Sequence, residues 1–344
     1  MMRPFLEDLS AFASSISDGG HTLFNAPFQW VCLANGDADF QDNVIFFGFD
    51  AGAADPVLVA KVPRLAKNGW MLKTEHDHLA DLWDCMGNTA VDYVPRVYGF
   101  TSIQDRSVLM ISYVSGESLT RLTRKSFWAD PRQVTELARQ AASTLRALNE
   151  KTERPVQRSG NIGLTLQKNA DRFRGLFELN KEEDQALTEL VRTVNEKSRT
   201  VSHEVLVQGD FWHGNMIRDK KRGTLRFVDW QFARWSTDVS LDVYFFLLAG
   251  ALSTTAGGPV EERAEQAFRL LNQWRTDVIP EYLAAYGEPD RYLLLPQKYG
   301  MMVCCVEKAV RSALDFGYSH SDDLLWRALF AELLQWPDEN EGQD

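Results

Sequence analysis

Two acids and an amide are the residues of this chain whose types and spacing could do chemistry. Asp210 and Asn215 lie in the segment Gln208–Asn215, and Asp229 follows in the apolar segment Phe227–Trp230. A carboxylate can orient a hydroxyl group for attack, while carboxylate and amide oxygens can hold magnesium beside a nucleoside triphosphate. The pattern predicts transfer of a phosphoryl group to a hydroxyl group.

A predicted β-hairpin would position these residues. The short apolar runs 215–217 and 225–228 flank a charged segment, 219–223, that ends in glycine, as is typical of a hairpin turn. If the hairpin is centred near Arg222, Asn215 and Asp229 lie opposite each other with Cβ atoms about 5 Å apart. Both could then bind one Mg²⁺, and Asp210 could accept or orient the proton of the attacking hydroxyl.

Each of these residues also has an ordinary structural explanation. Asp and Asn beside glycine are common turn formers. Asp210 and Asp229, however, stand among apolar residues, where an acid is costly unless it is paired or bound to a metal. Taken together, the set favours a catalytic role for Asp210 and a metal-binding role for Asn215 and Asp229.

The same segment resembles the catalytic and metal loops of the aminoglycoside phosphotransferase and choline kinase-like superfamily. The residues that carry the resemblance are Asp210, Asn215, Asp229 and Asp242, and the wording Gly-Asp-Phe-Trp with Val-Asp-Trp-Gln is also similar to ecdysteroid kinase-like proteins. The resemblance implies an α+β, two-lobed protein kinase-like fold, with a small antiparallel β-sheet lobe carrying one main helix and a larger, mostly helical lobe. It also implies Mg²⁺ and ATP as cofactors, with GTP not excluded.

Two positions depart from the superfamily pattern. Gln208 stands where a histidine is usual, and Thr237-Asp238-Val239 stands where Gly-Asp-Pro is frequent. A glutamine amide still donates and accepts hydrogen bonds, so Gln208 bears on the positioning of the loop. Asp238 either braces the catalytic loop or lies in a surface turn. Asp242 could cap the helix that follows, and the resemblance implies that it also supports the catalytic region.

The first part of the chain has the features that the resemblance requires of a nucleotide lobe. The apolar run 57–62 predicts a strand that presents Lys61, and Glu75 begins a predicted helix. The resemblance implies that Lys61 contacts the triphosphate and pairs with Glu75. The alternative is that Lys61 is a snorkelling edge residue and Glu75 an ordinary first-turn acid.

The predicted lobes comprise residues 1–113, with 1–21 as an N-terminal extension, and residues 114–344. The run 107–117 predicts a buried strand that ends at Ser-Gly, and the resemblance implies that the backbone of Tyr113 and Val114 contacts the nucleotide base; a plain core strand would look the same. Predicted strands 30–34 and 43–47 flank Gly36, which is a poor match to a glycine-rich phosphate loop and is better explained by a hairpin turn.

Helices are predicted through most of the second lobe. Asp130-Pro131 is typical of a helix start, and an apolar stripe continues to Asn149. Further helices are predicted at about 183–197, 240–252, 260–285, 298–315 and 322–335. We expect the four cysteines to be core residues, and His213 either to touch the substrate or to pack inside the loop.

Composition limits the class of protein. The chain has 344 residues, 44% of them hydrophobic, and a net charge of −11. This charge argues against a nucleic-acid partner, and no apolar run reaches the roughly 20 residues of a membrane span. We therefore expect a cytoplasmic enzyme whose partners are a nucleoside triphosphate and a small hydroxyl-bearing substrate. The acceptor and the oligomeric state stay open.

A different class of function is a nucleotide-binding pseudokinase or regulatory module on the same fold. Gln208 and the glycine-poor segment around Gly36 favour it. A binding module, however, has no need of Asp210. A protein kinase is disfavoured because no activation segment ending in Ala-Pro-Glu follows Asp229.

Overall fold

The computed structural model divides the chain into two compact units. It describes residues 2–18, 21–24, 27–34, 43–156, 162–255, 257–313 and 320–337. Unit 1 comprises Met1–Glu117 with Ile217–Ala233, and unit 2 comprises Ser118–Met216 with Arg234–Asp344. The segment Ile217–Ala233 thus packs with unit 1, although in the sequence it lies between the two stretches of unit 2. The functional lobes predicted from the sequence, residues 1–113 and 114–344, stay a prediction.

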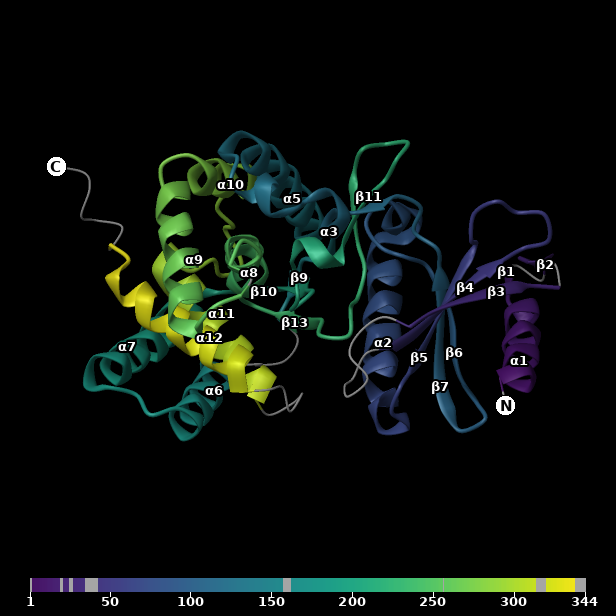
Figure 1. Ribbon diagram of the computed structural model, residues 1–344, viewed down its shortest axis with the longest axis horizontal. Coiled ribbons are helices and arrows are strands. Elements are labelled where there is room, and N and C mark those ends of the chain that lie inside the picture. The colour runs from purple at the N-terminus through teal and green to yellow at the C-terminus, as the bar shows by residue number, and fades with distance from the viewer. Residues whose placement is uncertain are drawn as a thin grey trace. The chain divides into compact units, whose positions relative to one another are not determined.

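Unit 1 is built on a five-stranded antiparallel sheet of order β3-β4-β5-β7-β6 (Figure 1). The strands are β3 (Gln29–Ala34), β4 (Asn43–Phe49), β5 (Leu58–Pro63), β6 (Val97–Ile103) and β7 (Arg106–Ser112). The other elements of this part of the chain are α1 (Met2–Ser15), β1 (Ser17–Asp18), β2 (His21–Thr22), η1 (Ala66–Asn68), α2 (Gly69–Met86) and η2 (Gly87–Asp92).

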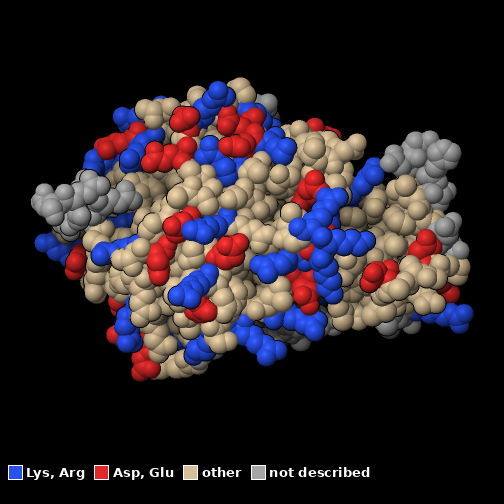
Figure 2. All heavy atoms as spheres, turned by 90° about the horizontal axis from the view of Figure 1, so that it is seen from above, with Lys and Arg blue, Asp and Glu red and all other residues tan. Residues whose placement is uncertain are grey.

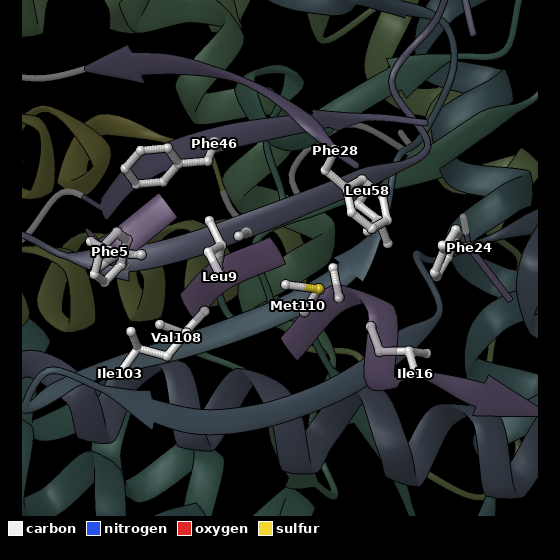
Figure 3. Packing of buried hydrophobic residues seen from close by; sticks show 13 residues of the cluster. Phe5, Leu9, Ile16, Phe24, Phe28, Phe46, Leu58, Ile103, Val108 and Met110 are labelled. Carbon is white, nitrogen blue, oxygen red and sulfur yellow. The ribbon is translucent and has the colours of Figure 1, made fainter. Parts of the chain in front are cut away.

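The two faces of this sheet are covered by different helices. Successive side chains of a strand point to opposite faces, so Leu58, Ala60 and Val62 of β5 share one face and Lys61 lies on the other. The first face packs against α1, and Figure 3 shows Leu9 of α1 among buried side chains of the sheet. The second face packs against α2. Lys61 is therefore placed under α2 by the alternation of its strand.

The predicted hairpin that follows the catalytic segment is present. Strands β11 (Met216–Arg218) and β12 (Leu225–Phe227) form a small sheet with β8 (Glu117–Ser118). The turn closes where the backbone N–H of Asp219 donates to the carbonyl of Thr224 at 2.9 Å. The Asp219 carboxylate also accepts from the backbone N–H groups of Lys221 and Arg222, at 2.8 and 2.9 Å. The turn is thus centred between Lys221 and Arg222.

Unit 2 is mostly helical. Its helices are α3 (Leu119–Leu122), α4 (Lys125–Trp128), α5 (Pro131–Thr152), α6 (Ile162–Leu176), α7 (Lys181–Lys197), α8 (Ser240–Leu252), α9 (Val260–Trp274), α10 (Val278–Tyr286), α11 (Gln297–Arg311) and α12 (His320–Glu332). Short elements are β9 (Arg154–Pro155), η3 (Ser198–Thr200), β10 (His203–Val207), η4 (His213–Asn215), β13 (Arg234–Ser236) and η6 (Leu333–Gln335). In α8 and α11 nearly all side chains are buried, so these two helices form the centre of the unit.

The structure confirms the fold class and corrects several elements. The antiparallel sheet, the helical second unit and helix 240–252 are as predicted. The helix predicted over 260–285 is wrong: it is two helices, because Asp277 caps a new one by accepting from the backbone of Val278 at 2.6 Å. Helices α1 and α6 were not predicted, and residues 2–15 of the predicted extension belong to the core of unit 1. Gly36 lies outside the described residues.

Candidate active site

Unit 1 holds a buried lysine between two carboxylates. Lys61 Nζ on β5 lies 2.7 and 2.9 Å from the two carboxylate oxygens of Glu75 on α2, and 2.8 Å from Asp229 Oδ1. Lys61 is 7% exposed and Glu75 is fully buried. Burial alone would lower the pKa of Lys61, but the charges and hydrogen bonds of Asp229 and Glu75 outweigh it and raise that pKa. The ammonium group is therefore fixed in its charged form.

The predicted ion pair between Lys61 and Glu75 is present, but its setting differs from the expectation. Helix α2 begins at Gly69, so Glu75 lies in the second turn and not at the helix start. It is not an ordinary first-turn acid, and Lys61 is not a snorkelling edge residue, because both side chains are buried. The contact of Lys61 with a triphosphate stays a prediction.

Asp229 is held by an unusual backbone. Its φ angle is +67°, in the left-handed region that residues other than glycine rarely adopt. The backbone N–H of the next residue, Trp230, donates to Glu75 Oε1 at 3.3 Å, which anchors this turn to α2. The Asp229 side chain remains 36% exposed, so part of its carboxylate faces solvent while one oxygen contacts Lys61. Such a carboxylate can bind a cation.

An exposed apolar patch lies beside Lys61 on the same face of the sheet. Residues paired across antiparallel strands point to the same face, and the register pairs Leu33 with Ile45 and Ile45 with Lys61. The same register pairs Val31 with Phe47. Val31 and Leu33 are 49% and 44% exposed, which is high for such side chains in a sheet. The apolar patch, defined as Val31, Leu33, Ile45 and Phe47, can receive a flat apolar group such as a nucleotide base.

The predicted hinge segment adjoins this patch. The ring of Tyr113 meets the ring of Phe47 edge-on, with centroids 5.8 Å apart. The backbone N–H of Tyr113 donates to the carbonyl of Val57 at 3.1 Å, and Val114 is buried. The Tyr113 N–H is therefore used within the sheet, and a contact of Tyr113 or Val114 with a base stays a prediction that would depend on their other backbone groups.

In unit 2 a buried carboxylate holds the segment Gln208–Asn215, which is the predicted catalytic segment. Asp242, in the first turn of α8, accepts from the backbone N–H groups of Gln208 and Gly209 at 2.6 and 2.8 Å. Gly209 has a φ of +75°, which a side chain would disfavour. Burial raises the pKa of Asp242 to about 6, although the two N–H bonds oppose this. Because Gln208 is anchored through its backbone, the loop is held without the usual histidine side chain.

The roles expected of Asp238 and Asp242 are exchanged in part. Asp242 supports the catalytic segment, as the resemblance implied, but it does not cap α8. Asp238 accepts from the backbone N–H of Ser240 at 2.9 Å at the start of that helix, and it is buried. Asp238 is therefore not a surface-turn residue. Its hydrogen bond to Ser240 does not connect it to the catalytic loop.

Asp210 is held in one orientation by its neighbours. Asn215 Nδ2 donates to the carbonyl of Asp210 at 3.0 Å and to its Oδ2 at 2.8 Å. Lys308 Nζ, from α11, contacts Oδ1 of the same carboxylate. The Asp210 side chain is 22% exposed, so it is reachable while being fixed. A fixed, reachable carboxylate can orient a hydroxyl group.

Sequence reasoning missed the basic residues of α11. Lys308 Nζ also lies 3.3 Å from the carbonyl of Gly209, to which Arg311 donates at 3.0 Å. Glu307 forms bonds of 2.7 and 2.8 Å with Arg234 and of 2.6 Å with Arg311. The one available indication was that Glu307, Lys308 and Arg311 follow the apolar run Met301–Val306 in the same helix, where charged residues are costly unless they are paired.

His213 packs inside the loop and is 4% exposed. Its ring lies 4.9 Å from that of Trp128, and burial lowers its pKa to about 4. It is therefore a neutral packing residue at neutral pH. The four cysteines divide: Cys304 and Cys305 are buried as expected, whereas Cys32 and Cys85 are exposed and are not core residues.

Each of the two predicted magnesium ligands has an oxygen donor of the type that magnesium prefers. Both bonds described for Asn215 are made by its amide nitrogen, so the amide oxygen can face a cation, and Asp229 offers a partly exposed carboxylate. In the described part of the chain, no group of three or more His, Cys, Asp or Glu residues could hold a metal alone. A magnesium ion would accordingly depend on phosphate oxygens and water for its remaining ligands.

The surface and helix lengths add two observations. Figure 2 shows Lys and Arg side chains on one face with Asp and Glu beside them, so the charges there are interspersed and not of one sign.

Within the described ranges, no helix is both long and apolar enough to cross a membrane.

Comparison with solved structures identifies the fold. A candidate aminoglycoside phosphotransferase from Ralstonia eutropha JMP134 matches with a TM-score of 0.60 and 14% identity, covering 95% of this chain and 96% of that one. Aminoglycoside phosphotransferase APH(4)-Ia, in complex with ADP and hygromycin B, matches with a TM-score of 0.57 and 14% identity over 90% and 95% of the chains. APH(3'')-Id from Streptomyces rimosus matches with a TM-score of 0.50 and 19% identity over 87% and 97%. The fold is therefore the kinase-like fold of these enzymes.

The sequence itself identifies the family. The model of the phosphotransferase enzyme family matches residues 53–291, which is more than half of the chain. The chain belongs to this family. The sequence matches no curated protein.

Proposed function

We propose that this chain transfers the γ-phosphoryl group of ATP to a hydroxyl group of a small molecule. The observation that carries the proposal is the fixed, reachable carboxylate of Asp210, held by Asn215 on a loop that Asp242 anchors. Binding a nucleotide does not require such a group. Orienting an acceptor hydroxyl does.

Unit 1 is proposed to bind the nucleotide. The apolar patch beside Lys61 would take the base, and the Lys61 ammonium group would contact the phosphates. The backbone of Tyr113 and Val114 is proposed to contact the edge of the base. The complex of APH(4)-Ia with ADP supports adenine as that base.

Asn215 and Asp229 are proposed to hold magnesium. The turn pairs Asp219 with Thr224, one position away from the predicted register that places Asn215 opposite Asp229, so the proposal rests on the donor types of the two side chains and not on that register. When bound, the ion would neutralise charge on the phosphate oxygens. Lys61 supports Asp229 in this role, because their contact of 2.8 Å fixes one carboxylate oxygen and the orientation of the other.

Asp210 is proposed to align the acceptor hydroxyl with the γ-phosphoryl group. Its carboxylate would accept the hydroxyl proton while the oxygen attacks phosphorus and the bond to ADP breaks. The carboxylate does not need to reorient, because Asn215 already fixes it. Such a fixed geometry lowers the barrier without new bonding by the protein.

A nucleotide-binding module is the competing function. Gln208 supported it, but the backbone N–H of Gln208 anchors the loop at 2.6 Å from Asp242, so the substitution leaves the loop in place. The intact set of Lys61, Glu75, Asp210, Asn215 and Asp229 supports an enzyme.

Incubation with γ-labelled ATP and Mg²⁺ separates the alternatives. The protein would be given a library of small hydroxyl compounds and, separately, a protein extract. We expect label in one or more small molecules. Label in protein alone would assign a protein kinase, and no label in either, with ATP still bound, would assign the nucleotide-binding module.

A further inference from the structure

A buried cation built into unit 2 faces the proposed catalytic carboxylate. Lys308 is 7% exposed and lies on α11, where residues 300–310 are all buried. Its ammonium group contacts Asp210 Oδ1 and the carbonyl of Gly209, and it lies 3.5 Å from the centre of the Phe245 ring. Three groups therefore hold it, and it cannot move into water as a surface lysine would.

Asp210 is the carboxylate that balances this charge. Glu307, the neighbour of Lys308 in sequence, is already bonded to Arg234 and Arg311. Burial would raise the pKa of Glu307, but these two arginines lower it to about 2. Asp242 uses its carboxylate on the backbone of Gln208 and Gly209. Removing Asp210 from Lys308 would leave a buried charge unpaired.

A second cation of α11 contacts the same loop. Arg311 donates to the carbonyl of Gly209, the residue that precedes Asp210. A positively charged group brought to Asp210 would therefore compete with Lys308 for the carboxylate and would approach Arg311 as well. Like charges a few Å apart in a partly buried site repel strongly, because little water screens them.

On the basis of the proposed function, we propose that Lys308 is a fixed internal counter-ion of Asp210, and that the acceptor is consequently an alcohol without an ammonium group near its reacting hydroxyl. Sugars and other polyols belong to this class, whereas amino alcohols and aminoglycosides do not. Lys308 acts through Asp210 and is thus a positioning and specificity-determining residue. The acidic net charge of the chain, which allows a cationic acceptor, is overridden locally by this pair.

Acceptors matched in shape but not in charge test the proposal. Choline would be compared with 3,3-dimethylbutan-1-ol, and glucosamine with glucose, by phosphoryl transfer from γ-labelled ATP, and each acceptor found in the hydroxyl library would be compared with its amino analogue. We expect the uncharged member of each productive pair to have a kcat/KM about tenfold or more above that of the charged member.

Variants show whether Lys308 causes this preference. Lys308→Met keeps the length of the side chain and removes its charge, so it should reduce the preference for the uncharged member at least severalfold. Lys308→Arg should retain the preference, as should Lys151→Met, which removes the charge of an exposed lysine on α5. Thermal unfolding and Mg-ATP binding of each variant confirm that it is folded.

Three results would overturn the proposal. A wild-type preference for the charged member would show that Lys308 moves aside for a substrate amine. An unchanged preference in a folded Lys308→Met variant would remove Lys308 from specificity. Transfer to no acceptor at all, with Mg-ATP bound, would instead remove the proposed function and this inference with it.

Discussion

At the scale of single residues, burial decides which charges can act. Lys61 is buried and paired with Glu75 and Asp229. Little water therefore screens its charge, and its ammonium group is kept from turning into solvent. Asp229 differs from Glu75 because its side chain is 36% exposed while that of Glu75 is fully buried. This difference supports the proposal that Glu75 holds Lys61 and that Asp229 faces a ligand.

Asp229→Ala should weaken magnesium-dependent binding of ATP. The variant keeps the contact of Lys61 with Glu75, so ATP without magnesium should bind nearly as in the wild type. With magnesium present, we expect a loss of roughly tenfold to a hundredfold in affinity, the range that follows loss of a metal-supporting group. Titration calorimetry with and without Mg²⁺ measures the affinity for ATP under both conditions. A variant that binds Mg-ATP as tightly as the wild type would remove Asp229 from the metal site.

At the scale of elements, the start of α8 couples a helix to the catalytic loop. The buried carboxylate of Asp242 holds the loop, and the buried carboxylate of Asp238 accepts from the backbone N–H of Ser240, the first residue of the helix. Burial raises the pKa of each to about 6 from an ordinary value of 3.8. Between these values the folded chain binds more protons at these sites than the unfolded chain does, so their contribution to stability falls as pH rises.

This coupling predicts a pH dependence of stability that Asp242→Asn should reduce. One group can contribute at most about 1.4 kcal/mol per pH unit within its window. Denaturant unfolding of both proteins at several pH values from 4 to 7 measures the two slopes. Asp242→Asn should be less stable throughout, because an amide cannot accept both backbone bonds, yet its stability should fall less as pH rises. Equal slopes would contradict the assignment.

Helix α1 belongs to the core of unit 1, so loss of a buried side chain from it should lower the stability of the protein. Leu9 is fully buried in a cluster with Phe46, Leu58 and Met110. Leu9→Ala should lower the free energy of unfolding by about 2–5 kcal/mol, the range for a leucine deleted from a packed core. Glu7→Ala, on the exposed side of the same helix, should change it by only about 0.5 kcal/mol or less. Similar losses for both variants would mean that α1 does not pack as described.

The sequence predicted the features that are indicated by a local pattern of residues, and it missed those that depend on contacts between distant residues. Lys61 and Glu75 were found because a strand and a helix follow each other closely, and helix 240–252 because its residues are apolar nearly all round. Helix α1 was not predicted because the strands against which it packs lie far along the chain. Lys308 was missed because it meets Asp210 across 98 residues, and its apolar neighbours in sequence indicate only that it needs a partner, not which one.

At the scale of the whole molecule, the candidate groups are divided between two compact units. Unit 1 carries Lys61, Glu75 and Asp229, and unit 2 carries Asp210 and Asn215. The proposed reaction requires both sets to act on one nucleotide. A change in either unit should therefore affect turnover, but only changes in the set that contacts the nucleotide should also affect its binding.

The turnover of Asp210→Asn tests whether Asp210 directs phosphoryl transfer. The amide cannot accept the hydroxyl proton, so turnover should fall by about 10²–10⁴-fold while Mg-ATP binding stays close to that of the wild type. The double variant Asp210→Asn/Lys308→Met, which removes the unpaired cation, is the control for stability and should not recover turnover. Near-normal turnover by Asp210→Asn would contradict the account.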